Sequence, residues 1–272
     1  MNNFLDIILH CKDDELKNIV IKRAFELEES ESTDRNYIIP SENLHDYDSY
    51  YHGFIKSDVK IFSSIGNSNE ECYTLNNYDY LVEFFKYIRE KNVKSKSDLI
   101  KYMSSFMDNY FGEYKGIDKR AEFLRTKEGT ATIDMFKKTG LAACSERAAI
   151  ANNILTMIGF DSFFLTGEIN GEQHAFNAIL TSNNHLTLID TTHCSGLYDK
   201  DNNLIGTATY FYNLGTINNI SSSYITGYEP LELQDSIARI DDDGYIRYEA
   251  NGNLKKYCIE PFHLTEEENK RL

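Results

Sequence analysis

Three residues in the second half of the chain have the types and the order that covalent amide chemistry requires. Cys144 opens a segment with helical character, and His174 lies in the segment Glu172-Gln173-His174-Ala175-Phe176-Asn177. Asp190 follows the largely apolar segment Leu186–Ile189. A thiol is a useful nucleophile at neutral pH only as the thiolate, and a helix N-terminus and a nearby imidazolium both lower its pKa. We interpret Cys144 as a nucleophile, His174 as its base and Asp190 as the carboxylate that orients the imidazole.

The segments around these residues predict a helix followed by an antiparallel meander. Apolar and small residues recur at helical spacing from Ser145 to Ile158, and Gly159 stands where a helix C-cap is expected. Asn170-Gly171 is a strong hairpin signal, and Ser182-Asn183-Asn184 marks a second turn before the Asp190 strand. The helix would present Cys144 at its N-terminus, and two adjacent strands would carry His174 and Asp190.

The register of the second hairpin decides whether His174 and Asp190 can meet. Successive side chains of a strand point to opposite faces, so a turn with an odd number of residues places His174 opposite Thr192 and Asp190 opposite Phe176. The two side chains then share a face as diagonal neighbours. A two-residue turn would place them on opposite faces, so the interpretation requires an odd or bulged turn.

The first part of the chain predicts helices but no readable chemistry. Helical periodicity covers about residues 12–28, 81–88 and 97–110, whereas residues 37–76 have no clear period, and a weaker helical stretch spans 131–138. We expect a mainly helical N-terminal region over residues 1–115 and a catalytic domain over residues 116–272. Near the C-terminus, residues 245–248 and 254–259 flank Asn251-Gly252 and predict a further hairpin.

Composition restricts the partners. With 28 basic against 43 acidic residues, the net charge of −15 disfavours binding to nucleic acid, which needs clustered Lys and Arg. The chain shows no signal peptide and no transmembrane segment, so no membrane partner is expected. Its five cysteines are odd in number and form no CxxC pair, which is typical of reduced thiols in the cytosol. We expect a cytoplasmic protein that acts on a protein or peptide; the sequence leaves its oligomeric state open.

Residues of about 130–195 resemble the transglutaminase-like superfamily of papain-like folds. The resemblance rests on Cys144-Ser145-Glu146-Arg147-Ala148, His174-Ala175-Phe176-Asn177 and Asp190-Thr191-Thr192, in that order. It implies an α+β core in which a nucleophile helix packs on an antiparallel sheet. It also implies a Cys-His-Asp triad that acts on amides, with Cys144, His174 and Asp190 in these roles and no cofactor.

The chain departs from the family pattern at two positions. Phe176 stands where the family often has Trp, so it keeps an apolar wall for substrate but has no indole N–H. Lys138 stands six residues before the cysteine, where a papain-like pattern would have a Gln that stabilises the oxyanion. The backbone N–H of Cys144 is one oxyanion donor, and the second donor is unassigned.

Two other interpretations involve neighbouring residues. His193 and Cys194 could join Cys144 and His174 as four zinc ligands, but adjacent residues of a strand point apart, so we expect no metal site. Glu146 and Arg147 are expected on the solvated side of the first helical turn, where Glu146 would also complement the helix dipole.

The sequence therefore predicts a cysteine amide hydrolase that works through an acyl-thioester, either a peptidase or a protein glutamine deamidase. A transamidating transglutaminase is the alternative within the same chemistry. A catalytically silent transglutaminase-like module that binds a protein partner is the alternative from another class.

Overall fold

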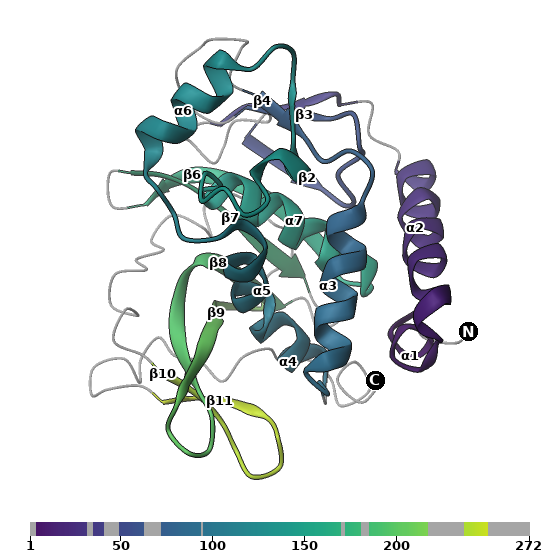
Figure 1. The fold of residues 1–272 in the computed structure, drawn as a ribbon, viewed down its shortest axis with the longest axis vertical. Coiled ribbons are helices and arrows are strands. Elements are labelled where there is room, and N and C mark those ends of the chain that lie inside the picture. The colour runs from purple at the N-terminus through teal and green to yellow at the C-terminus, as the bar shows by residue number, and fades with distance from the viewer. Residues whose placement is uncertain are drawn as a thin grey trace.

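The computed structural model describes residues 4–31, 35–40, 49–62, 72–93, 95–169, 172–180, 185–216 and 237–249. They form a mixed α and β protein in which helices cover one side of an open sheet (Figure 1). No helix among these residues is long and apolar enough to cross a bilayer.

Helix α7 (Cys144–Met157) lies at the centre of the molecule. It packs on the sheet through β6, β7 and β8 and on helices α2 and α3 from its other side. Nearly all of its side chains are buried, including polar ones. Helix α7 is therefore an interior helix and not an amphipathic helix with one face in solvent. It ends at Gly159, whose φ of +91° suits the left-handed position after a helix, as predicted.

The main sheet has seven strands in the order β11-β10-β8-β7-β6-β2, with β9 paired to β8. The predicted meander is confirmed in the antiparallel strands β6, β7 and β8. Strand β2 from the first part of the chain joins β6 at the edge, and β10 pairs with β8 in parallel. These strands are β2 (Tyr50–His52), β6 (Asp161–Ile169), β7 (Glu172–Leu180), β8 (His185–Tyr198), β9 (Leu204–Thr216), β10 (Ile237–Ile240) and β11 (Ile246–Glu249).

The first part of the chain contains both helices and strands. A small second sheet has the order β1-β3-β4-β5, so the region without a clear period holds short strands. The predicted helix over 97–110 is interrupted at Tyr102, and residues 131–138 form a short strand and a 3₁₀ turn in place of a helix. The elements are α1 (Phe4–His10), α2 (Asp13–Ser30), β1 (Tyr37–Ile38), β3 (Lys60–Phe62), β4 (Cys72–Thr74), α3 (Asp79–Glu90), α4 (Lys96–Lys101), α5 (Met103–Phe111), α6 (Ile117–Thr126), β5 (Ala131–Thr132) and the 3₁₀ helix η2 (Ile133–Phe136).

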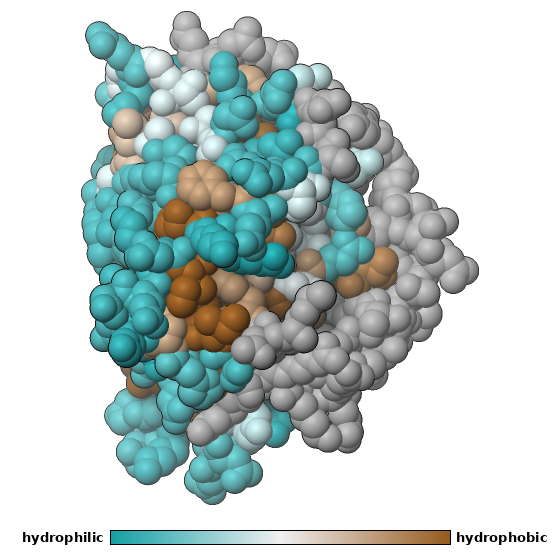
Figure 2. Space-filling model, turned by 90° about the vertical axis from the view of Figure 1, so that its right-hand side faces the viewer, coloured by the Kyte–Doolittle hydropathy of each residue, from teal (hydrophilic) through white to brown (hydrophobic). Residues whose placement is uncertain are grey.

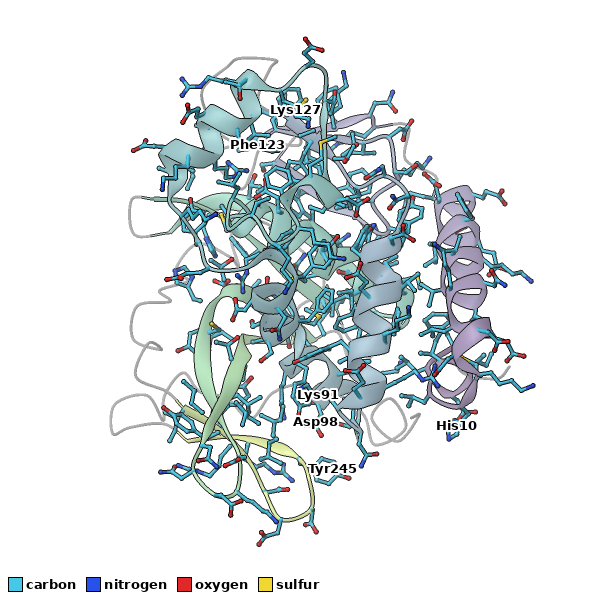
Figure 3. All side chains as sticks on the ribbon, viewed as in Figure 1. His10, Lys91, Asp98, Phe123, Lys127 and Tyr245 are labelled. Carbon is cyan, nitrogen blue, oxygen red and sulfur yellow. The ribbon has the colours of Figure 1, made fainter. Side chains whose placement is uncertain are left out.

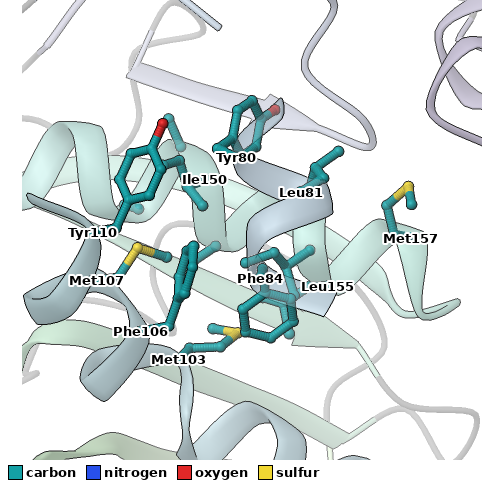
Figure 4. Close-up of a cluster of buried hydrophobic side chains, with 14 of the residues drawn as sticks. Tyr80, Leu81, Phe84, Met103, Phe106, Met107, Tyr110, Ile150, Leu155 and Met157 are labelled. Atoms are coloured by element: carbon teal, nitrogen blue, oxygen red, sulfur yellow. The ribbon is translucent and has the colours of Figure 1, made fainter. Parts of the chain in front are cut away.

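One hydrophobic cluster connects the two parts of the chain. Side chains of α3 and α5, such as Phe84 and Phe106, lie against Ile150 and Leu155 of α7 (Figure 4). The division at residue 115 stays a prediction, and the core extends across it without a break. The side that carries α1 and α2 is largely hydrophilic and has an apolar area within it (Figure 2).

Strand β11 differs from its predicted pairing. It pairs antiparallel with β10, with Ile240 opposite Ile246 across a turn at residues 241–245. The other predicted partner, residues 254–259, lies outside the described residues, as does Cys258.

Candidate active site

Cys144 is the first residue of α7, as the sequence predicts. The chain enters the helix through Gly140, whose φ is +71° and where a Cβ would lie 2.0 Å from the carbonyl oxygen of Glu113. Only glycine fits this close approach, which is held by a 2.7 Å hydrogen bond from the Lys115 N–H to the Gly140 carbonyl oxygen. The thiol of Cys144 is partly exposed at this helix end.

His174 and Asp190 meet with the predicted register. Strands β7 and β8 pair Asn177 with Ile189 and Leu180 with Leu186, which is the register of an odd turn. The turn residues themselves lie outside the described part. His174 Nε2 is 2.8 Å from Asp190 Oδ2, and both side chains are buried.

A bulge in β8 adds a second histidine to this pair. Asp190 lies opposite Tyr210 of β9, and the next paired residue is Cys194, so three residues bulge out between them. Asp190 Oδ1 accepts the N–H groups of Thr192 at 2.8 Å and His193 at 3.1 Å. His193 Nδ1 lies 2.8 Å from Asp190 Oδ2, so one carboxylate serves two imidazoles.

His174 and Cys144 each affect the pKa of the other, so the imidazole and the thiol are neighbours. Because Nε2 of His174 faces Asp190, Nδ1 is the nitrogen available to the thiol. Burial alone would raise the pKa of Cys144, but the interaction with His174 outweighs it and lowers the pKa below its ordinary value. The N–H of Ala175 and the charge of Arg120 act in the same direction.

The same neighbours favour a charged imidazole. Burial would lower the pKa of His174, but the Asp190 carboxylate and the contact with Cys144 raise it to about 10. The charge of His174, against the effect of burial, holds the pKa of Asp190 below its usual range. At neutral pH the shifts keep His174 as an imidazolium and Asp190 as a carboxylate, and they favour the thiolate of Cys144 more than an ordinary cysteine would.

Glu146 and Arg147 are buried, so their expected placement on the solvated side of the helix was wrong. Arg147 donates to Asp108 at 2.5 Å and to the Thr191 carbonyl oxygen at 2.9 Å. Glu146 pairs with Arg120 of α6, which sequence reasoning missed because the partners are 26 residues apart and no local pattern links them.

The remaining predicted residues lie in other settings. Phe176 is 1% exposed and stacks beside the imidazole of His174 with ring centroids 6.0 Å apart, so it supports the histidine; a contact with substrate stays a prediction. The ammonium group of Lys138 donates to the Asn109 carbonyl oxygen at the end of α5. Gln173 precedes His174, and its buried amide nitrogen has no hydrogen-bond partner among the described residues.

Among the described residues, the ligand atoms of His174, Asp190 and His193 lie within 4.8 Å of one another, so this group could hold a metal ion. Asp190 accepts four hydrogen bonds here, two on each of its oxygens. The pKa of the Cys194 thiol is affected by Asp108, Arg147 and Thr207, so these residues are its neighbours. His193 and Cys194 thus contact different groups, as adjacent strand residues do.

Comparison with known proteins gives no relative. No protein-family model, no curated protein and no solved structure matches this chain.

Proposed function

We propose that the protein is a cysteine-dependent amide hydrolase that acts through an acyl-thioester. The observation that carries the proposal is the 2.8 Å contact between His174 and Asp190, together with the effect of His174 on Cys144, whose thiol pKa is lowered while the imidazole pKa is raised to about 10. These shifts favour a nucleophilic thiolate beside a proton donor. The proposal includes a papain-like, transglutaminase-like core, for which the helix on an antiparallel sheet is the supporting feature.

The chemistry follows from the positions of the three groups. The Cys144 thiolate attacks the amide carbonyl carbon, and the carbonyl electron pair moves onto oxygen. When the tetrahedral intermediate collapses, the C–N bond breaks and the imidazolium of His174 donates its proton to the leaving amine or ammonia. A water molecule then attacks the thioester and gives its proton to His174, and the carboxylic acid and the thiol are released.

Asp190 maintains the geometry of this cycle. Its carboxylate is fixed by two backbone N–H groups of the β8 bulge, and it holds the Nε2 side of His174, which leaves Nδ1 for the thiol. The arrangement also stabilises the imidazolium while the proton is on the ring.

One donor to the oxyanion can be assigned. The backbone N–H of Cys144 is among the first N–H groups of α7, which have no acceptor within the helix. Gln173 has an unpaired amide nitrogen, but it is the strand neighbour of His174, and successive side chains of a strand point to opposite faces. The second oxyanion donor is therefore unassigned.

Hydrolysis is the favoured outcome over transamidation. A transferase must keep water from the thioester and admit an amine, commonly through a channel lined by large aromatic residues. The chain has no Trp, and Phe176 is buried beside His174. We therefore propose a peptidase or a protein glutamine deamidase, with a protein or peptide as substrate and the cytosol as its location.

A panel of peptides and proteins tests the proposal. Incubation should release ammonia from glutamine side chains or create new amino termini, and the Cys144→Ala variant should do neither. Efficient incorporation of an added primary amine with little acid product would show a transglutaminase. If the wild type and Cys144→Ala are equally inert across a broad panel while the fold is intact, the binding-module alternative is favoured.

A further inference from the structure

A buried ion pair lies beside the proposed nucleophile and has no part in the chemistry above. Arg120 of α6 is 1% exposed and Glu146 of α7 is fully buried. The guanidinium donates to Glu146 Oε1 at 2.5 Å and to Oε2 at 3.2 Å, which is a bidentate contact. Two charges removed from water are costly to bury, so such a pair is weak evidence for stability and its position calls for another explanation.

Glu146 connects this pair to the nucleophile. It is the third residue of α7, two positions after Cys144, and its Oε2 accepts the backbone N–H of Ala143 at 2.8 Å. Ala143 has no side chain that could cap the helix, so the Glu146 carboxylate ties down the turn that carries the thiol. Ser145 lies between Cys144 and Glu146, and its hydroxyl forms a 2.8 Å hydrogen bond with the Tyr73 hydroxyl.

Glu146 also creates an electrostatic problem. A carboxylate two residues from a thiolate repels it and would raise the pKa of the thiol. Arg120 compensates, since its positive charge lowers the pKa of Cys144 while it neutralises Glu146. Without Arg120, the capping carboxylate would oppose the charge state that catalysis needs.

The other titratable groups that face Cys144 can be assigned. His174 contributes from β7, Tyr73 from β4, and Tyr114 from the loop before α6. Burial raises the pKa of both tyrosines, so they are neutral near pH 7. Arg120 and Glu146 are therefore the fixed charges beside the thiol, in addition to His174.

We propose that Arg120 is a positioning residue for Cys144, which holds the first turn of α7 through Glu146 and supplies the charge that keeps the thiol ionised. The inference deepens the proposed function and rests on it. Helix α6 is anchored by Phe123, whose ring packs against Phe136 with centroids 5.3 Å apart and lies under the ammonium group of Lys127 (Figure 3). From the same helix, Arg120 reaches the carboxylate of Glu146.

The test is the pH dependence of Cys144 alkylation by iodoacetamide, followed by peptide mapping in Arg120→Met, Glu146→Gln and the double variant. Arg120→Met should move the inflection upward by about one pH unit and slow labelling about tenfold at pH values below the inflection. Glu146→Gln keeps a capping oxygen and leaves Arg120 unopposed, so its inflection should move downward. The double variant should lie closer to the wild type than Arg120→Met does.

A purely structural role predicts a different pattern. Both single variants would then lower the melting temperature, and their inflections would stay at the wild-type position or shift in the same direction. Either of these results would overturn the proposal. If Arg120→Met does not fold, Arg120→Lys and Glu146→Gln carry the test, because the lysine keeps the charge and should shift the inflection far less than Glu146→Gln does.

The alkylation assay uses no substrate, so the two proposals fail separately. If wild-type Cys144 reacts no faster than an ordinary thiol, the proposed function fails. Opposite shifts in Arg120→Met and Glu146→Gln would then still support the ion pair as a control on the thiol.

Discussion

Two cysteines in this chain have similar exposure and opposite acidity. Cys144 and Cys194 are both partly exposed. The pKa of Cys144 is lowered, whereas burial, with the carboxylate of Asp108, raises the pKa of Cys194 to about 11. Accessibility alone therefore does not make a reactive thiol.

Each thiol also lies near a bidentate or close arginine–carboxylate pair. Arg120 contacts Glu146 beside Cys144, and Arg147 contacts Asp108 beside Cys194, both at 2.5 Å. The two regions differ in the imidazole. His174 lowers the pKa of Cys144, and no histidine is among the groups that affect the pKa of Cys194. The comparison shows that the imidazolium supported by Asp190 is the larger influence that lowers the pKa of Cys144, and that Arg120 adds a smaller one.

The largest expected effect is the loss of the nucleophile itself. On a substrate found in the panel, Cys144→Ala should lower the rate of product formation by at least ~10³-fold, because the thioester can no longer form. The matched control Cys194→Ala should stay within about twofold, since that thiol is protonated at neutral pH. A comparable loss in Cys194→Ala would break the comparison.

Removal of the imidazole should give the next largest effect. His174→Ala takes away both the proton donor and the cation that lowers the thiol pKa, so hydrolysis should fall by about 10²- to 10⁴-fold and iodoacetamide labelling of Cys144 should slow. His193→Ala leaves the His174–Asp190 contact in place, and its labelling rate should remain within about twofold. If His193→Ala lowered the hydrolysis rate and the labelling rate as much as His174→Ala does, the assignment of His174 as the catalytic histidine would be wrong.

The pH dependence should separate alkylation from hydrolysis. The thiolate forms as the pH rises through the lowered pKa of Cys144, and both reactions should rise there. Above about pH 10, His174 loses its proton, so hydrolysis should fall up to tenfold per pH unit while alkylation continues. Parallel profiles above pH 10 would argue against His174 as the acid.

The ionised groups should also affect stability in opposite pH ranges. The folded-state pKa of His174 is raised, so its contribution is complete below about pH 6.5 and is lost as the pH rises through about 10. The folded-state pKa of Asp190 is lowered, so its contribution is present above about pH 4 and is lost in acid. Thermal unfolding of the wild type and Asp190→Asn should therefore converge at low pH; a constant difference would contradict this assignment.

The sequence carried enough information for the local framework of the site. The helix from Cys144 and its end at Gly159 follow from periodicity and turn residues, which depend on near neighbours. The turn residues left two β7–β8 registers open, and the observed one was predicted because the triad requires an odd turn. The helix break at Tyr102 did not follow, because the same apolar stripe continues through α4 and α5.

The charged surroundings of the site could not be predicted in the same way. The β8 bulge that brings His193 to Asp190 interrupts the alternation of a strand without any Gly or Pro to mark it. The Arg120–Glu146 pair joins two helices, and a charged residue at a helix start is usually solvated. Such contacts depend on tertiary structure and leave no periodic signal.

Thiol labelling tests the central claim most directly, because it compares the two regions in one sample. Limiting iodoacetamide near neutral pH, followed by peptide mapping, should label Cys144 well before Cys11, Cys72, Cys194 and Cys258. The account predicts at least a tenfold lead over Cys194, as the opposite pKa shifts require. If Cys144 is among the slowest thiols of the folded protein, the account is contradicted.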